Sequence, residues 1–290
     1  MNREVSLTRT ATLHLSRHDH PPEHPHRDPR EEVGRHWAVS LVEQHAFEVY
    51  TGTARWRLGP GSAFLNRPGM PYRCRHYEHE PLDICLSLSL DGSLIEALRS
   101  ADVPLDHAPI ATAPSNRLNY LRHRLLRWHE GSGEPIVGET LAGEIVAAVA
   151  QGPPRRSAPF RPGHLRRYSE RVDAARHRLD TRATERHSLS DLANEAGLSM
   201  YHFARIFREL VGVPPHRYLL KARLARSAGL LRAGSSVTYS CYQAGFDSLS
   251  HFAEAFRKEF GVVPSRYAGG AGGERAESGQ RAGEKRVNIG

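Results

Sequence analysis

The sequence predicts a protein of two parts, with a small β-barrel or sandwich in the N-terminal half and an all-α domain in the C-terminal half. Two observations predict this fold class. Residues 36–90 form short apolar runs separated by glycine and proline, whereas residues 163–268 show helical periodicity and repeat themselves. The chain of 290 residues is long enough for each half to bury its own core.

Turn residues bound the strands that we expect between residues 36 and 90. Gly59-Pro60-Gly61 and Pro68-Gly69 each predict a tight turn, and Thr51-Gly52 predicts a turn inside a run of aromatic and β-branched residues. Short strands punctuated in this way are typical of a sandwich or barrel. The runs expected to form them are His36–Val42, Phe47–Leu58, Ala63–Leu65 and Ile84–Leu90.

Residues 115–150 change to helical spacing. A first helix carries a leucine stripe, Gly131-Ser132-Gly133 interrupts it, and Leu141–Ala150 continues as an alanine-rich helix. We expect these helices to cover the barrel. The stripe fits either the partner helix of a homodimer or the barrel of the same chain, and both alternatives stay open. Its members are Leu118, Leu121, Leu125 and Leu126.

Two segments are expected to lack regular structure. Residues 151–162 contain four prolines, which remove backbone donors and restrict their neighbours, so this segment is expected to be the interdomain linker. Residues 269–290 have almost no apolar side chains to offset the entropy of ordering, so we expect a disordered tail.

The positive charge of the chain is localised. The formal net charge is +8; residues 1–162 carry 19 basic and 19 acidic side chains, whereas residues 163–268 carry 17 and 10. A localised positive field attracts a polyanion such as nucleic acid. No apolar run could span a membrane, the N-terminal residues lack the apolar stretch of a signal peptide, and three cysteines are too few for a disulfide framework. We therefore expect a cytoplasmic protein without cofactors.

The C-terminal region contains an internal repeat. His202–Tyr218 (HFARIFRELVGVPPHRY) and His251–Tyr267 (HFAEAFRKEFGVVPSRY) share ten of seventeen positions. Solenoid arrays need three or more units, so two copies indicate the duplication of one compact helical unit.

Each copy has the features of a helix-turn-helix. In the first, Ser188 can cap a helix over Ser190–Ala196, Gly197 can end it, and Ser199 can cap a second helix over Met200–Leu210. In the DNA-binding version of this motif, a short glycine-containing turn joins the helices and the second helix enters the major groove.

The second copy repeats these features with Gly245 at the turn. Either Asp247 or Ser248 can cap the helix Leu249–Phe260 that follows. One face of each second helix is apolar and should pack inward. The inward-facing residues are Phe203, Ile206, Phe207 and Leu210 in the first copy, and Phe252, Ala255, Phe256 and Phe260 in the second.

The pattern GLSMYHFARIFRELVGVPPHRYLLKARL … GFDSLSHFAEAFRKEFGVVPSRY resembles the AraC/XylS family of bacterial transcription regulators. The resemblance covers about 100 residues, and it implies two helix-turn-helix subdomains joined by a long helix, here about Pro215–Ala233. It also implies that the recognition helices enter successive major grooves on one face of double-stranded promoter DNA, and that RNA polymerase is a partner.

The resemblance also assigns roles along both recognition helices. An arginine such as Arg205 can make a bidentate contact to guanine, and the exposed pairs Arg208/Arg257 and Arg217/Arg266 recur at equivalent positions, as two sets of phosphate contacts would. Base-reading positions are Tyr201, Ala204 and Arg205, then Leu249, Ser250, Ala253 and Glu254. Phosphate-contacting positions are Ser199, His202, Arg208, Arg217, Ser248, Arg257, Lys258 and Arg266.

Three positions depart from the family pattern. Glu254 stands where a basic residue is frequent, and it could accept a hydrogen bond from cytosine or repel phosphate. Ser240 occupies a position where an apolar core residue is expected. Gly229 interrupts the joining helix at a cost of about 1 kcal/mol relative to alanine.

Residues 10–90 resemble, less specifically, the cupin-like sensor domains of the same family, through the stretch YTGTARWRLGPGSAFLNRPGMPYRCRH. This resemblance implies a small barrel that can hold a small-molecule effector. The expected organisation is therefore a sensor and dimerisation domain at 1–150, a linker at 151–162, a DNA-binding domain at 163–268 and a tail at 269–290.

Two constellations could hold a metal, and either would suit the alternative of a cupin-fold metalloenzyme with a helical appendage. Cys74, His76 and Cys85 are suitable Zn²⁺ ligands but lack a clear fourth member, which favours buried thiols. The histidine-rich set includes the pair His24-Pro-His26, which prolines surround and which is expected before the strand region; this favours surface or structural histidines. It comprises His14, His18, His20, His24 and His26, with Glu31 or Glu32 and His76 or His79 as further ligands.

Neither constellation contains a nucleophile–base pair, so catalysis is not expected. A DNA-modifying protein with the same reader domain is a further alternative. It would need a reactive cysteine, and Cys241 is instead expected to be buried on a scaffold helix.

Overall fold

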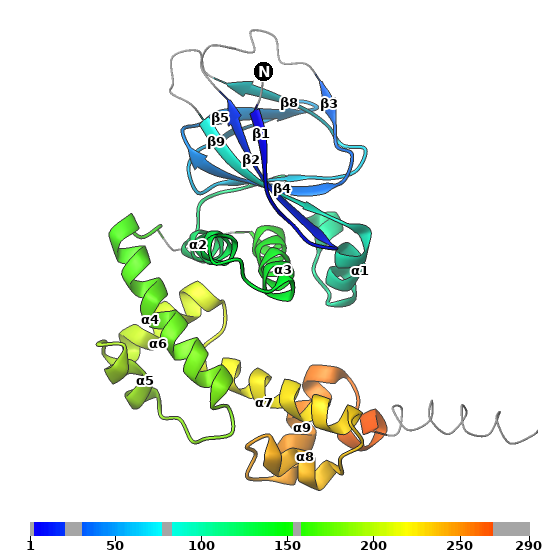
Figure 1. Ribbon diagram of the computed structural model, residues 1–290, viewed down its shortest axis with the longest axis vertical. Helices are drawn as coiled ribbons and strands as arrows, with labels where there is room; N and C mark the ends of the chain where they lie inside the picture. The colour runs from blue at the N-terminus through cyan, green and yellow to red at the C-terminus, as the bar shows by residue number, and fades with distance from the viewer. Residues whose placement is uncertain (1–2, 21–30, 77–82, 153–157, 269–290) are drawn as a thin grey trace, which may run out of the picture. The chain divides into compact units, whose positions relative to one another are not determined.

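The computed structural model describes residues 3–20, 31–76, 83–152 and 158–268, and its chain divides into two compact units, Met1–Leu165 and Arg166–Gly290 (Figure 1). The first unit is built on antiparallel sheets with helices, and the second is helical. The predicted fold class, a β-unit with covering helices followed by an all-α unit, is confirmed.

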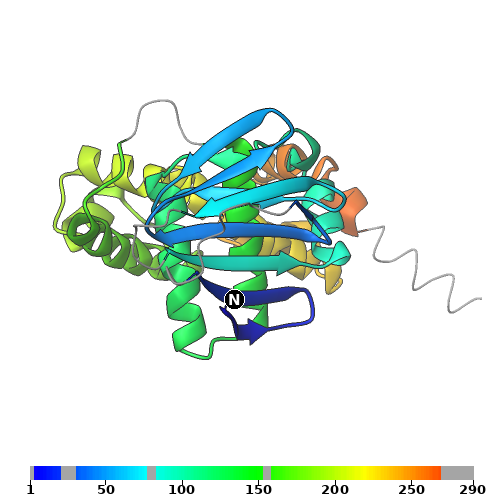
Figure 2. The ribbon, with the colours of Figure 1, turned by 90° about the horizontal axis from the view of Figure 1, so that it is seen from above.

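The strands of the N-terminal unit form two antiparallel sheets. Figure 2 views the strands from above, with the β1–β2 hairpin in dark blue at one edge. The six-stranded sheet has the order β1 (Arg3–Arg9), β2 (Leu13–His20), β9 (Asp83–Leu90), β4 (Trp37–Gln44), β7 (Ala63–Asn66), β10 (Ala111–Thr112). The four-stranded sheet has the order β3 (Glu32–Val33), β8 (Pro71–His76), β5 (Phe47–Thr51), β6 (Ala54–Leu58).

The core of this unit lies between the two sheets, because alternate side chains of each strand point to the same face. Val42 and Cys85 of the larger sheet pack in one cluster with Phe47, Val49 and Leu58 of the smaller sheet. The hairpin β5–β6 turns at Gly52, whose φ of 56° lies in the left-handed region.

Several elements were not predicted from the sequence. His14, His18 and His20 lie on β2, a strand that was not expected; on it, buried Leu13 and Leu15 flank the half-buried His14. Strands β1 and β8 and helix α1 (Gly92–Ser100) were also missed. Of the other histidines, His24, His26 and His79 lie outside the described residues.

Helices α1, α2 (Asn116–Glu130) and α3 (Pro135–Gln151) lie together on one side of the strands (Figure 1). The short helix η1 (Leu105–His107) lies between α1 and α2 in the chain. Leu118, Leu121 and Leu125 are buried within the chain. The free partner-facing stripe considered for these three leucines was therefore wrong, and the packing alternative holds for them.

The end of the expected linker is bound to α2. Helix α3 ends at Gln151 and α4 begins at Pro162; of the segment between them, residues 153–157 lie outside the described residues. The buried Asn116 donates its amide to the carbonyl of Ala158 at 3.0 Å and accepts from the backbone N–H of Phe160 at 2.6 Å. The predicted tail, residues 269–290, also lies outside the described residues.

The C-terminal unit consists of six helices in the described residues. They are α4 (Pro162–Thr181), α5 (Leu189–Glu195), α6 (Met200–Val211), α7 (Pro215–Arg232), α8 (Val237–Gln243) and α9 (Leu249–Phe260). Figure 1 shows α7, the predicted joining helix, running from the group α4–α6 to the group α8–α9. Within the described residues, no helix has the length and apolar character needed to cross a membrane.

Candidate nucleic-acid interface

The first helix-turn-helix consists of α5, a turn and α6. The hydroxyl of Ser188 accepts from the N–H of Asp191 at 3.0 Å, which caps α5, and Ser199 caps α6 through the N–H of His202 at 3.4 Å. Gly197 has a φ of 60°, a left-handed conformation that glycine adopts without steric cost, and it allows α6 to leave in a new direction.

The second helix-turn-helix, α8 to α9, repeats this geometry. Ser236 caps α8 through the N–H of Tyr239, and Ser248 caps α9 through the N–H of His251, so of the two capping candidates the side chain used is that of Ser248. Gly245 at the turn has a φ of 89°. The duplication inferred from the sequence is thus also a duplication of caps and turns.

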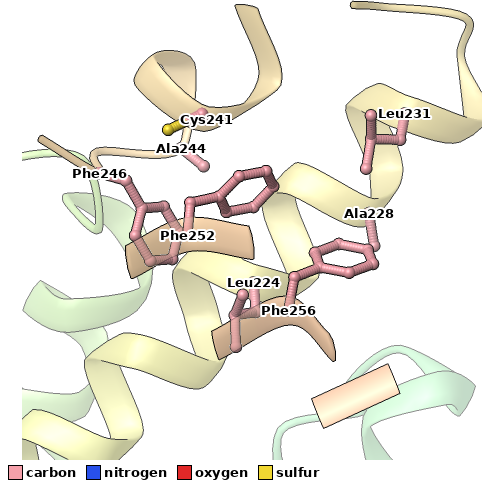
Figure 3. Packing of buried hydrophobic residues seen from close by; sticks show 8 residues of the cluster. All are labelled: Leu224, Ala228, Leu231, Cys241, Ala244, Phe246, Phe252 and Phe256. Carbon is pink, nitrogen blue, oxygen red and sulfur yellow. The ribbon is translucent and has the colours of Figure 1, made fainter. Parts of the chain in front are cut away.

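Phenylalanines anchor one side of each second helix. Phe203 and Phe207 of α6 are fully buried, and so are Phe252 and Phe256 of α9. In the second helix-turn-helix, the rings of Phe252 and Phe256 pack against α7 and α8 (Figure 3). The other residues of this cluster are Leu224, Ala228 and Leu231 of α7, Cys241 and Ala244 of α8, and Phe246 of the turn.

The opposite side of α6 is open to solvent. The exposed fraction of Tyr201 is 83%, Arg205 is exposed and Ala204 is half-buried, and these three positions share one face because they are spaced by three and four residues. Among the described residues, Arg205 pairs with Glu209 at 3.8 Å on the same helix, and a pair at this distance with an exposed arginine holds that side chain weakly. Arg205 can therefore turn toward a ligand.

The equivalent face of α9 has different chemistry. Leu249, Ser250 and Glu254 are exposed and Ala253 is half-buried. Ser250, Ala253 and Glu254 correspond in the repeat to Tyr201, Ala204 and Arg205, so an acidic side chain stands on α9 where a basic one stands on α6. The structure places all seven predicted base-reading residues on these two faces.

The predicted phosphate-contacting residues differ in how accessible they are. The serines accept the capping hydrogen bonds described above and still have a hydroxyl proton to donate. His202 is half-buried, with its ring edge-on to Tyr168 at 5.6 Å. The exposed residues are Ser199, Arg208, Arg217, Ser248, Arg257, Lys258 and Arg266.

Ser240 in the second helix-turn-helix and Gly229 in the joining helix α7 are the two positions at which the sequence predicts lower stability. Ser240 is fully buried on α8, and its hydroxyl has no hydrogen-bond partner among the described residues. Gly229 is exposed on α7, and a Cβ added there would meet no described atom within 4 Å. The second helix-turn-helix therefore has a polar serine in its core, and α7 has a glycine at a position where a larger side chain would fit.

The hydrogen bonds that link α7 to α4 and to the loop before α5 were not predicted from the sequence. Tyr218 of α7 accepts from Arg176 Nε at 3.2 Å and donates to Asp180 at 3.0 Å, which joins α7 to α4. Arg223 of α7 donates to two carbonyls of the α4–α5 loop. A signal was present: an arginine followed at +1 and +8 by buried aliphatic residues begins at Arg171 on α4 and again at Arg223 on α7.

Among the described residues, the cysteine and histidine candidates do not form a metal site. Cys74 and His76 are half-buried on β8, and Cys85 is buried on β9. In the described ranges, no group of three or more His, Cys, Asp or Glu side chains could hold a metal ion. Cys241 is buried as expected, and burial raises the pKa of its thiol, which disfavours the reactive thiolate.

The comparisons with known proteins agree with the helix-turn-helix assignment. Residues 192–269 match the family model of a helix-turn-helix domain. No curated protein matches the chain.

Three solved structures illustrate the similar proteins. A probable AraC family transcriptional regulator from Rhodopseudomonas palustris is 25% identical with a TM-score of 0.34, and the match covers 35% of this chain and 97% of that one. ToxT from Vibrio cholerae is 12% identical with a TM-score of 0.34, over 89% of this chain and 98% of its own. The C-terminal domain of AraT, a response regulator from Geobacillus stearothermophilus, is 24% identical with a TM-score of 0.32, over 34% and 83%.

Proposed function

We propose that this chain, whose C-terminal unit carries a helix-turn-helix domain of the AraC type, is a sequence-specific DNA-binding transcription regulator without catalytic activity. One observation carries the proposal. Two helices with the same cap, the same glycine turn and the same buried phenylalanines each present a solvent-exposed face, in the half of the chain that holds the excess positive charge.

Each recognition helix reads base edges in the major groove. Arg205 makes a bidentate contact to O6 and N7 of a guanine, which contributes about 1–3 kcal/mol of discrimination against another base. Glu254 accepts from the N4 amino group of a cytosine, and Leu249 makes an apolar contact such as one with a thymine methyl group. The two segments read on one DNA face are about 34–36 Å apart.

The exposed serines and basic residues hold the phosphates. Arg208 and Arg257 occupy equivalent positions near the ends of α6 and α9, and Arg217 and Arg266 recur beyond them. Contacts of this kind fix the register of the helices on the duplex and release counterions, so affinity falls steeply with salt concentration.

The N-terminal unit is the sensor in this proposal, and its ligand is a small molecule with an apolar or aromatic body. Trp56 and Tyr72 are half-buried and pack on the cluster between the two sheets. The hydroxyl of Tyr72 donates to Glu32 at 2.7 Å. Burial, and to a smaller extent this hydrogen bond, raises the pKa of the Tyr72 hydroxyl. A binding site needs such a combination of apolar surface with a few polar groups.

The regulator acts in the cytoplasm on promoter DNA, with RNA polymerase as a partner. The chain forms a homodimer in this proposal, and the exposed apolar side chains of Ile136 and Val137 on α3 support it. The described residues contain no group of three ligand side chains that favours the metalloenzyme alternative.

In vitro selection tests this function. The full chain is incubated with a library of random duplexes, and bound molecules are recovered and sequenced over several rounds. The proposal predicts a motif of two parts separated by about one helical turn, with binding that weakens as salt rises. Recovery of unrelated sequences with uniform affinity would contradict it.

A further inference from the structure

The loop between α4 and α5, residues 182–187, contacts the second helix-turn-helix as well as the first. Arg223, in the middle of α7, donates Nε to the carbonyl of Ala183 at 2.7 Å and Nη2 to the carbonyl of Glu185 at 2.8 Å. The planar guanidinium group holds two acceptors in a fixed geometry, which a single ammonium group cannot do. One side chain therefore fixes the direction in which this loop leaves α4.

The turn of the second unit lies directly on the same loop. A Cβ on Gly245 would come 2.8 Å from Cα and 3.0 Å from the carbonyl oxygen of Thr184, and 3.2 Å from Nε of Arg223. The contact is between backbones, so the loop could not yield by rotating a side chain. Glycine is required here by its φ of 89° and also by this close approach.

Opposite charges on the two sides of this contact also attract each other. Asp247, two residues after the glycine, lies 3.7 Å from Arg186 of the loop, although this pair is exposed and contributes little. Burial lowers the pKa of Arg223, and the charge of Asp247 opposes that shift. The same carboxylate thus faces both arginines.

The turn of the first unit lacks such a contact. A Cβ on Gly197 would approach only the guanidinium group of Arg171, at 3.7 Å, among the described atoms within 4 Å. The close backbone approach is therefore a feature of the second turn and does not follow from the helix-turn-helix geometry itself.

We propose that Ala183, Thr184, Glu185, Arg223 and Gly245, here called the loop clamp, set the distance and rotation between the two recognition helices. A connection through α7 alone lets the second helix-turn-helix move relative to the first as that helix bends, whereas a second point of attachment opposes this motion. This inference rests on the proposed DNA-binding function. Arg223 is in this view a positioning residue that touches no base.

The consequence is a strict spacing requirement in the DNA site. Inserting one base pair between the two halves moves them by about 3.4 Å and rotates them by roughly 34°. A pair of helices in fixed relative positions cannot follow this change, whereas a pair that pivots can.

The first arm of the test uses no DNA. Ketone-containing amino acids at the exposed positions Asn194 of α5 and Thr238 of α8 carry spin labels, so the native cysteines stay untouched, and pulsed electron spin resonance gives the distance distribution in the full chain. Arg223→Ala should broaden the distribution about twofold, and Arg223→Lys should broaden it less. Circular dichroism establishes that each variant is folded.

The matched control is Arg226→Ala. Arg226 lies on the same helix and donates to the carbonyl of Gln243 at 3.1 Å, a contact that stays between α7 and α8. This variant should keep the distribution of the parent chain. Equal widths for the parent chain and Arg223→Ala, or equal broadening by Arg226→Ala, would overturn the clamp.

The second arm measures affinity for the duplex chosen by selection and for the same duplex with one inserted base pair. The parent chain and Arg226→Ala should lose on the order of tenfold, comparable to one mismatched base pair, and Arg223→Ala should lose only a small part of that. Equal losses for all three would overturn the clamp. If no duplex is selected, the proposed function fails, and the spin-label distances still decide the clamp.

Discussion

The two helix-turn-helix units share their helix caps and glycine turns and differ at positions in the core and on the exposed face. Ser188, Gly197 and Ser199 recur as Ser236, Gly245 and Ser248 with the same caps and the same left-handed turns. Local rules for ending and starting helices tolerate few residue types, so these positions are among those that the duplication preserves.

The differences lie at two kinds of position. In the core of the first short helix, buried Leu192 of the first unit corresponds to buried Ser240 of the second, whose hydroxyl has no partner among the described residues. On the reading face, Arg205 corresponds to Glu254. The two copies thus keep one geometry, while a core position and an exposed position have changed their chemistry independently.

The largest effect is expected for Leu192→Ala in the first unit. Removing this buried side chain should lower the free energy of unfolding by about 2–5 kcal/mol, because the transfer of its methyl groups is lost and a cavity remains. Chemical denaturation of the full chain measures the change. The exposed Leu189 on the same helix is the control, and Leu189→Ala should change stability by a few tenths of a kcal/mol at most. Similar losses for both variants would mean that the core assignment is wrong.

A smaller effect separates the two kinds of DNA contact expected of α6. Arg205→Ala should remove about 1–3 kcal/mol of discrimination at one base pair and leave the other positions of the motif unchanged. Arg208→Ala should instead weaken all sequences similarly and reduce the salt slope by about one. Titrations on single-base variants of the selected duplex, at several salt concentrations, distinguish the two. Uniform weakening by Arg205→Ala would show that this arginine contacts only phosphate.

The smallest effect sharpens the contrast in the cores. Ser240→Ala removes the unpartnered buried hydroxyl and keeps Cβ, so the second unit should gain about 1 kcal/mol in free energy of unfolding. The control Ser227→Ala removes a buried hydroxyl that donates to the carbonyl of Leu224 at 2.8 Å, and it should not stabilise the chain. A loss of stability in Ser240→Ala would imply that this hydroxyl has a partner in solution.

Local patterns predicted the helical half well because each element there carries its own signals. The helix Leu249–Phe260 agrees with its predicted bounds, and Ser199 caps α6 as expected. Gly229 and Ser240 were identified because each departs from the residue type that the family pattern has at its position. The structure agrees with this: a Cβ on Gly229 would meet no described atom within 4 Å, and the buried hydroxyl of Ser240 has no partner among the described residues.

The elements that were missed depend on distant contacts. Strand β8 (PYRCRH) pairs with β5 and β3, and its alternation of arginine with half-buried residues becomes meaningful only when a partner sheet covers one face. The contact between Thr184 and Gly245 joins residues about sixty positions apart, and no local periodicity records it. Glycine at a turn indicates a positive φ, but not the backbone that it approaches.

Hydroxyl-radical footprinting of the full chain on the selected duplex tests the central claim most directly. We expect two protected segments on one face of the DNA, about one helical turn apart, with the footprint of each lost separately when residues of α6 or α9 are replaced. A single protected segment, or protection on opposite faces of the duplex, would contradict it.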